Sequence, residues 1–312
     1  MNPSEINESL ARTIIGKRFV DNVITDVKEI DSWVHHLYRV SFSDRPPVVL
    51  RFPAKRKFSH YGESYNFRRE VVVSDLLSKN TVVTVPRIFH QGVYRGVEYL
   101  IVENLDGVNL NTITGGDIKS APTQVIRDWG KLIASVHSIK SDNFRYIESH
   151  RDIDFERWSD VIKDYLKFRV ENSDVFNDME KSGMITLFER LKSDLDFERD
   201  PRLVLYNTHG DNMIVRNGKM IGFSDVMLAF FGDRSIDFMF PRFFGVEEQF
   251  KEGYLEAGGS IPTKIDSLTT IALMNYYLST VINYVGAEGR RASWSDSYRA
   301  KLELLLKEND AI

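Results

Sequence analysis

The sequence predicts a two-lobed α+β protein, in which a small β-rich N-terminal lobe precedes a larger, mainly helical C-terminal lobe. Three observations support this fold class. The chain of 312 residues is long enough for two regions that each bury a core. Its first third is rich in strand-forming segments with one inserted helix, whereas the rest has mainly helical periodicity. We therefore expect an N-terminal lobe over residues 1–105 and a helical C-terminal lobe over residues 106–312.

The N-terminal lobe is predicted from two strand pairs and the helix between them. Residues 37–42 and 48–52 are rich in β-branched and aromatic side chains, and a turn with two prolines separates them, which is typical of a hairpin. Residues 63–79 carry apolar side chains near helical spacing and predict a helix. Residues 87–92 and 97–103, split by an Arg-Gly pair, indicate a second antiparallel pair.

Helical periodicity dominates the C-terminal lobe, over residues 128–139 and again over the acidic stretch 155–199. One strand pair interrupts it, because residues 213–223 contain two apolar runs separated by a turn with an Asn-Gly pair. Asn212 stands immediately before this hairpin and Asp225 just after it. A hairpin brings its two ends together, so these side chains are expected to share one hard divalent cation. The alternative is that they only cap loops through local hydrogen bonds.

The composition excludes several classes of protein and site. The chain has no cysteine, which excludes disulfides, thiolate metal sites and cysteine nucleophiles. Its net charge of −4 argues against a nucleic-acid-binding surface. The longest apolar runs fall far short of the roughly 20 residues that span a bilayer, and the first residues lack the order of a signal peptide. We expect a cytoplasmic protein that binds neither nucleic acid nor a membrane.

The segment 203–238 resembles a known family. Aminoglycoside phosphotransferases, choline kinases and their relatives have a loop written HGDxxxxN before such a hairpin, and a second aspartate in an IDF or IDW motif after it. Without a gap, the loop asparagine of the family falls on Asn212 and the metal-binding aspartate on Asp225. The resemblance implies a bilobal protein-kinase-like fold, ATP or GTP as phosphoryl donor, one or two Mg²⁺ ions, and a hydroxyl of a small molecule as acceptor.

The catalytic position of the loop departs from the family pattern. The aspartate that accepts the proton of the attacking hydroxyl falls on Asn207, and the His-Gly pair before it falls on Leu205-Tyr206. An amide cannot act as that base. A second register takes the literal HGD that ends at Asp211, but it needs a four-residue deletion and leaves Arg216 where the asparagine belongs. We prefer the ungapped register, with Asn207 at the catalytic position and Asp211 as the reserve candidate.

The resemblance also assigns nucleotide-binding residues in the N-terminal lobe. Arg51 matches the strand residue that contacts the phosphates, and Glu70 matches the helix glutamate that pairs with it. Residues 99–105 resemble the hinge strand, so Glu103 and Leu105 are expected to bind the purine edge through their backbone. Residues 31–40 take the place of the glycine-rich phosphate loop but contain no glycine, which limits close approach to phosphates.

Two further matches are expected to be structural. Asp233 and Asp237 fall on the family pattern GDxxxD and are predicted to brace the loop that follows the metal site. His137, in a helix that resembles one of the family, is interpreted as structural as well.

The sequence leaves three functional hypotheses open. The first is an O-phosphotransferase, by analogy for an aminoglycoside-like antibiotic, and the acidic region 151–200 suits a cationic acceptor. The second is a catalytically impaired kinase-like protein that acts through binding, which Asn207 and the glycine-free loop suggest. The third is a metabolic kinase for an amino alcohol or a sugar, which shares the mechanism of the first.

Overall fold

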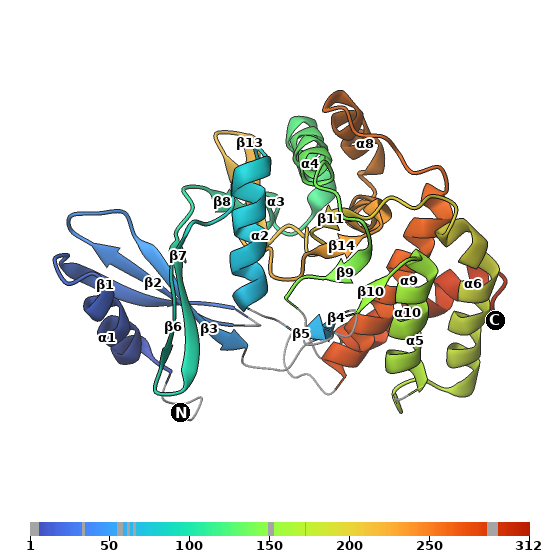
Figure 1. The fold of residues 1–312 in the computed structure, drawn as a ribbon, viewed down its shortest axis with the longest axis horizontal. Helices are drawn as coiled ribbons and strands as arrows, with labels where there is room; N and C mark the ends of the chain where they lie inside the picture. Colours follow the sequence, from blue (N-terminus) through green and yellow to red (C-terminus); the bar gives the residue numbers. More distant parts are fainter. Residues whose placement is uncertain are drawn as a thin grey trace.

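The computed structural model describes residues 6–32, 35–54, 59–60, 63–64, 67–148, 153–171, 173–285 and 293–312. It confirms the predicted α+β class, with a β-sheet region at the N-terminus and a mainly helical region at the C-terminus (Figure 1). The elements of the first region are α1 (Glu8–Arg18), β1 (Ile24–Ile30), β2 (His35–Phe42), β3 (Val48–Ala54), β4 (Ser59–His60), β5 (Glu63–Ser64), α2 (Phe67–Asn80), β6 (Ile88–Tyr94) and β7 (Val97–Glu103).

The N-terminal sheet is antiparallel and has the strand order β1-β2-β3-β7-β6. Both predicted hairpins are confirmed, as β2–β3 and β6–β7. The Arg95-Gly96 turn between β6 and β7 has positive φ at both residues, which is the geometry that matches the twist of the flanking strands. Side chains from alternate positions of β2 and β3 pack with α1 into a small core of their own.

Helix α2 packs against both regions. The prediction that it starts at residue 63 is wrong, because residues 63–64 pair with β4 as strand β5 and the helix begins at Phe67. Val73 and Leu77 of α2 are buried in the large C-terminal core, whereas Phe67 packs with Leu100 of the sheet. The helix therefore lies between the N-terminal sheet and the helical region (Figure 1).

In the described residues, the C-terminal region has two small sheets with helices around them. Its elements are β8 (Val108–Asn109), α3 (Leu110–Thr114), η2 (Ile118–Ser120), α4 (Thr123–Val136), β9 (Phe144–Tyr146), β10 (Asp154–Phe155), α5 (Trp158–Leu166), the π-helix η3 (Lys167–Glu171), α6 (Asp178–Leu195), β11 (Arg202–Val204), β12 (Met213–Arg216), β13 (Lys219–Phe223), β14 (Phe230–Gly232), η4 (Arg234–Phe238), α7 (Met239–Phe243), α8 (Glu247–Glu256), α9 (Ile265–Tyr284) and α10 (Trp294–Glu308). Two strand orders matter for the site: β10-β9-β14-β11 and β13-β12-β8.

The predicted C-terminal helices are present with different bounds. The helix expected over 128–139 is α4, which begins at Thr123 because Val125 and Ile126 already belong to its buried face. The stretch expected to be helical over 155–199 is divided into α5, a π-helical segment and α6. No helix in the described ranges is long and apolar enough to cross a membrane.

The β12–β13 hairpin is built as predicted. Its turn residues Asn217 and Gly218 have φ values of 52° and 73°, which the two-residue turn of this hairpin type requires. Strand β13 also contacts the chain that follows α2, because Thr84 donates to the carbonyl of Ile221 and accepts from the N–H of Phe223. These contacts fix the strand that leads to Asp225.

Gly222 allows that contact, and its replacement is expected to destabilise the protein. A Cβ at this position would lie 1.8 Å from the Thr84 carbonyl oxygen, so the backbone has to move. We expect Gly222→Ala to lower the free energy of unfolding by about 1–3 kcal/mol in urea denaturation. Gly16→Ala in α1 is the control, because its Cβ meets no described atom within 4 Å and alanine favours a helix. Equal stabilities of the two variants would disprove the close approach.

Candidate active site

A buried carboxylate fixes the start of the loop between β11 and β12. Asp237 is fully buried and accepts hydrogen bonds from the N–H groups of Leu205 (2.9 Å) and Tyr206 (2.8 Å). Its Oδ2 lies 3.2 Å from Nε2 of His137, and Nδ1 of that imidazole contacts the hydroxyl of Tyr254. His137 is structural, as predicted. Asp237 is structural as well, but the prediction that it braces the loop after the metal site is wrong, because it holds the loop before the hairpin.

Tyr206 makes a tight turn in this loop. Its φ is 60°, and the N–H of Asn207 donates to the carbonyl of Leu205 at 2.7 Å. This three-residue turn is rare for a residue with a Cβ and stores on the order of 1–3 kcal/mol of strain. The positive φ explains why glycine suits this position in the family pattern. Here the buried tyrosine ring and the Asp237 carboxylate hold the turn in place.

Asn212 and Asp225 lie at the same end of the hairpin, as predicted. Met213 of β12 pairs with Phe223 of β13, and the N–H of Ser224 donates to the Asn212 carbonyl at 2.9 Å. This hydrogen bond joins the two chain segments directly at the end of the ladder. Both residues are half-buried, so their side chains are partly shielded from solvent but still accessible to a ligand.

The donor atoms of these two residues suit a hard cation. The Asn212 amide donates to the Asn207 carbonyl (3.0 Å) and lies 3.4 Å from Nε2 of His209, which leaves its Oδ1 as a ligand atom. The Asp225 carboxylate accepts the N–H of Met227 through Oδ1 (2.9 Å), and its other oxygen can ligate. Among the residues that the structure describes, no three His, Asp or Glu side chains form a metal site. A cation would therefore take further ligands from a bound phosphate, as Mg²⁺ usually does.

Arg51 and Glu70 form a buried ion pair beside this end of the hairpin. Nη1 of Arg51 lies 2.6 Å from a Glu70 carboxylate oxygen, and Nη2 donates to the Ser224 carbonyl at 2.5 Å. Burial raises the pKa of Glu70 to about 7, although the Arg51 guanidinium opposes this shift. The pair therefore connects β3 and α2 to the residue next to Asp225.

The raised pKa of Glu70 predicts a pH dependence of stability. The folded protein holds this proton more tightly than the unfolded chain, whose glutamate has a pKa near 4.5. The resulting stabilisation is complete below pH 4.5 and is lost as the pH rises through about 7, by at most about 3 kcal/mol. Glu70→Gln has no such proton, so its free energy of unfolding should fall less over this range. Urea denaturation at several pH values compares the two proteins, and parallel curves would refute the shift.

Comparison with known proteins then identifies the family. A family model described as "Phosphotransferase enzyme family" matches residues 26–267. The chain belongs to this family. A search of the curated proteins gave no match.

Solved structures share the fold of this phosphotransferase over nearly its whole length. The GDP and kanamycin complex of APH(2")-IIia is 16% identical with a TM-score of 0.70, over 96% of this chain and 99% of that chain. Macrolide 2'-phosphotransferase MphH from Brachybacterium faecium is 15% identical with a TM-score of 0.62, over 95% and 97%. A thermostable mutant of APH(4)-Ia, complexed with ADP and hygromycin B, is 14% identical with a TM-score of 0.64, over 96% of each chain. The predicted bilobal, protein-kinase-like fold is thus confirmed.

The two candidate catalytic residues of the phosphotransferase have different surroundings. Asn207 is half-buried at the start of the loop. Asp211 is exposed, with 62% of its side chain accessible, and one carboxylate oxygen lies 3.7 Å from Nδ1 of His209. Arg216, which the second register puts in the asparagine position, ends β12 and pairs with Asp106 at 3.6 Å. It is at the opposite end of the strand from the candidate metal ligands, which favours the ungapped register.

The residues expected to form the hinge lie at and just after the end of β7. Glu103 ends β7, and its N–H donates to the Arg87 carbonyl at 2.8 Å. Its carboxylate accepts the Arg87 N–H at 3.2 Å. Leu105 is half-buried two residues later, before β8. With the Glu103 N–H occupied, recognition of a purine here would use other backbone groups of residues 103–105.

Sequence reasoning gave His35 no role in the site, although this residue lies where the phosphate loop of the family belongs. Trp33 and Val34 of that segment are outside the described residues. Burial lowers the pKa of His35 to about 4, while the Asp225 carboxylate raises it and Arg51 lowers it further. A neutral imidazole therefore lies close to both charged groups. Its place at the start of β2, within the segment 31–40 that replaces the phosphate loop, was the available signal.

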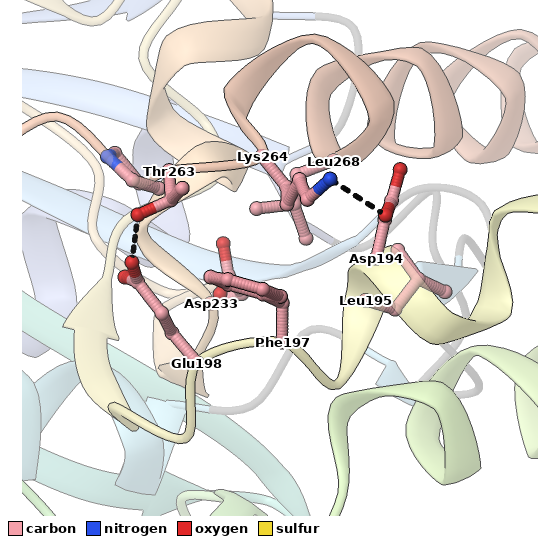
Figure 2. A pocket seen from close by; sticks show the side chains of 9 residues that line it. Asp194, Leu195, Phe197, Glu198, Asp233, Thr263, Lys264 and Leu268 are labelled. Atoms are coloured by element: carbon pink, nitrogen blue, oxygen red, sulfur yellow. Dashed lines mark hydrogen bonds and ion pairs between the residues drawn. The ribbon is translucent and has the colours of Figure 1, made fainter.

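The pocket in Figure 2 is separate from all these residues. It is lined by Asp194, Leu195, Phe197, Glu198, Asp233, Pro262, Thr263, Lys264 and Leu268. Lys264 pairs with Asp194 at 3.3 Å, and the Thr263 hydroxyl donates to Glu198, so its polar groups partly satisfy one another (Figure 2). Burial raises the pKa of Asp233. None of the predicted site residues lines this pocket.

Proposed function

We propose that this phosphotransferase is a Mg²⁺-dependent kinase that transfers the γ-phosphoryl group of ATP or GTP to a hydroxyl of a small molecule. The buried Arg51–Glu70 pair is the observation that carries the proposal. Its guanidinium reaches the Ser224 carbonyl, directly beside Asp225, so a phosphate-binding cation and a metal ligand are held together. We place the lobe boundary at residue 105 and the protein in the cytoplasm, where these nucleotides are available.

Each residue has a defined role in this proposal. Asn212 and Asp225 hold Mg²⁺, and Arg51 binds the phosphates in the orientation that Glu70 sets. Backbone groups of Glu103 and Leu105 bind the purine. The metal, when bound, neutralises charge on the transferred phosphoryl group. The GDP and ADP complexes of the solved relatives support nucleotide use.

The acceptor is proposed to bind beside the loop residue His209. Solved relatives were crystallised with kanamycin or hygromycin B, and another is a macrolide phosphotransferase, which supports an antibiotic-like acceptor. The ring of His209 meets that of Phe240, which contacts the half-buried rings of Phe244 and Tyr276. These aromatic neighbours favour testing acceptors with apolar rings as well as aminoglycosides, amino alcohols and sugars.

A second function is favoured by one specific observation. Asn207 occupies the position of the proton acceptor, and an amide cannot take a proton. Positioning and electrostatic stabilisation alone support slow transfer, with Asp211 as the reserve base. The second candidate is therefore a protein that binds nucleotide or ligand without efficient transfer.

Turnover measurements separate the two functions. ATP and GTP consumption is measured with Mg²⁺ against a panel of aminoglycosides, macrolides, amino alcohols and sugars. Acceptor-dependent turnover supports the kinase. Nucleotide binding without turnover against any acceptor supports the binding protein, and no binding of either nucleotide contradicts both.

A further inference from the structure

Arg69 is a buried cation next to the candidate site. It lies on α2 directly before Glu70, and only 1% of its surface is exposed. It shares the buried face of the helix with Val73 and Leu77, each four residues further on. Removing a guanidinium from water costs several kcal/mol unless its donors meet acceptors. A charged residue in this row therefore needs a specific set of contacts.

The donors of Arg69 reach two backbone carbonyls of the C-terminal region. Its Nε donates to the Ile147 carbonyl at 2.7 Å, and its Nη1 lies 3.4 Å from the Met227 carbonyl. Ile147 directly follows β9, which pairs with β14, and Met227 lies in the chain between β13 and β14. A guanidinium presents its donors in a rigid fork, so one side chain can fix both carbonyls relative to each other.

Met227 connects this contact to Asp225. Its N–H donates to Oδ1 of the Asp225 carboxylate at 2.9 Å. Its side chain is fully buried and packs with Phe67, Leu100 and Val102. Because Met227 accepts from the arginine and donates to the carboxylate, any shift of Met227 changes the direction of the Asp225 oxygens.

Arg51 holds the other side of Asp225. It donates to the Ser224 carbonyl and is itself paired with Glu70 of α2. Asp225 thus lies between two residues whose carbonyls accept hydrogen bonds from guanidinium groups. Both arginines depend on α2, one as a member of the helix and one through its ion pair. The helix therefore determines where the segment from Ser224 to Met227 lies.

We propose that Arg69 is a positioning residue for the metal site, which sets the direction of the Asp225 carboxylate by fixing Met227. The inference rests on the proposed function, because it requires Asp225 to be a metal ligand. Arg69 does not touch the reacting groups and acts through Met227. Helix α2 then sets both parts of the site: Glu70 orients Arg51 toward the phosphates, and Arg69 orients the carboxylate toward the metal.

Mn²⁺ binding tests this role without relying on turnover. Mn²⁺ accepts the same oxygen ligands as Mg²⁺, and its affinity is measured by electron paramagnetic resonance in the presence of non-hydrolysable ATP or GTP analogues. We expect Arg69→Met to weaken Mn²⁺ binding about 10- to 100-fold and to leave metal-free nucleotide binding unchanged. Arg69→Lys should recover only part of the affinity, because one ammonium cannot hold both carbonyls.

Arg68→Met is the matched control. Arg68 precedes Arg69 on α2, its side chain is 71% exposed, and it pairs with Glu148 at 3.2 Å. This variant should bind Mn²⁺ like the wild type. Wild-type Mn²⁺ affinity in a folded Arg69→Met protein, or a parallel loss of metal-free nucleotide binding, would overturn the positioning role.

Two further outcomes are decisive. Loss of the folded state in both Arg69 variants, seen by circular dichroism, would overturn the inference as well, since Arg69 would then be purely structural. Absence of Mn²⁺ binding by the wild type with either nucleotide would overturn the proposed function and the role of Arg69 with it. This last outcome is distinguishable because it does not involve the substitutions.

Discussion

Asp225→Ala is expected to lower acceptor-dependent turnover by at least about 10²–10³-fold and to abolish thermal stabilisation by Mg²⁺-nucleotide. The carboxylate is the only charged ligand proposed for the metal, and Asn212 alone leaves a neutral oxygen for a divalent cation. Charge on the transferred phosphoryl group would then be poorly neutralised. Melting temperatures with and without Mg²⁺-nucleotide, together with initial rates, measure both effects.

Asp106→Ala provides the control for this experiment. Asp106 is an exposed carboxylate that pairs with Arg216 at the opposite end of strand β12, so the variant removes the same charge away from the candidate metal ligands. It should retain wild-type stabilisation by Mg²⁺-nucleotide. Retained stabilisation in Asp225→Ala would show that this residue is no metal ligand.

Asn207→Asp is expected to increase phosphoryl transfer about 10²–10⁴-fold. The substitution introduces a carboxylate at the position of the proton acceptor, and Asp and Asn have nearly the same shape. The backbone carbonyl of residue 207 remains available to the Asn212 amide, so the metal ligand keeps its orientation. The turnover number should rise while the Michaelis constant for nucleotide changes little, because the gain is confined to the transition state.

Asp211→Ala discriminates between the two registers. It should have little effect on turnover if the ungapped register is right, since the Asp211 carboxylate is exposed and lies 3.7 Å from Nδ1 of His209. An inactive Asp211→Ala protein combined with an unimproved Asn207→Asp protein would reverse the assignment and make Asp211 the base.

Local patterns were sufficient to predict the hairpins and the meeting of Asn212 with Asp225. An Asn-Gly pair between apolar runs specifies a two-residue turn. The position of this turn determines which residues lie at the same end of the ladder. The boundaries of α2 and α4 were predicted less well. Strand β5 takes residues 63–64 through pairing with β4, which the helical spacing of apolar residues does not show.

Contacts between distant segments account for what the sequence did not reveal. Asp237 reaches back 32 residues to Leu205, and Arg69 reaches 158 residues forward to Met227. Leu205 and Met227 take part through backbone groups, which every residue has, so their side chains give no sign of these contacts in the sequence. The only available signal was a charged side chain in the buried row of α2, which marks Arg69 as a residue with specific partners.

The central claim is that Arg51 and the Asn212–Asp225 end of the hairpin bind a metal-nucleotide complex. Anomalous diffraction from crystals grown with Mn²⁺ and a non-hydrolysable ATP or GTP analogue tests it most directly. We predict a Mn²⁺ peak between Oδ1 of Asn212 and the Asp225 carboxylate, with the phosphates beside Arg51. A Mn²⁺ ion and phosphates bound elsewhere, for example at Asp211 without Asp225, would contradict the claim.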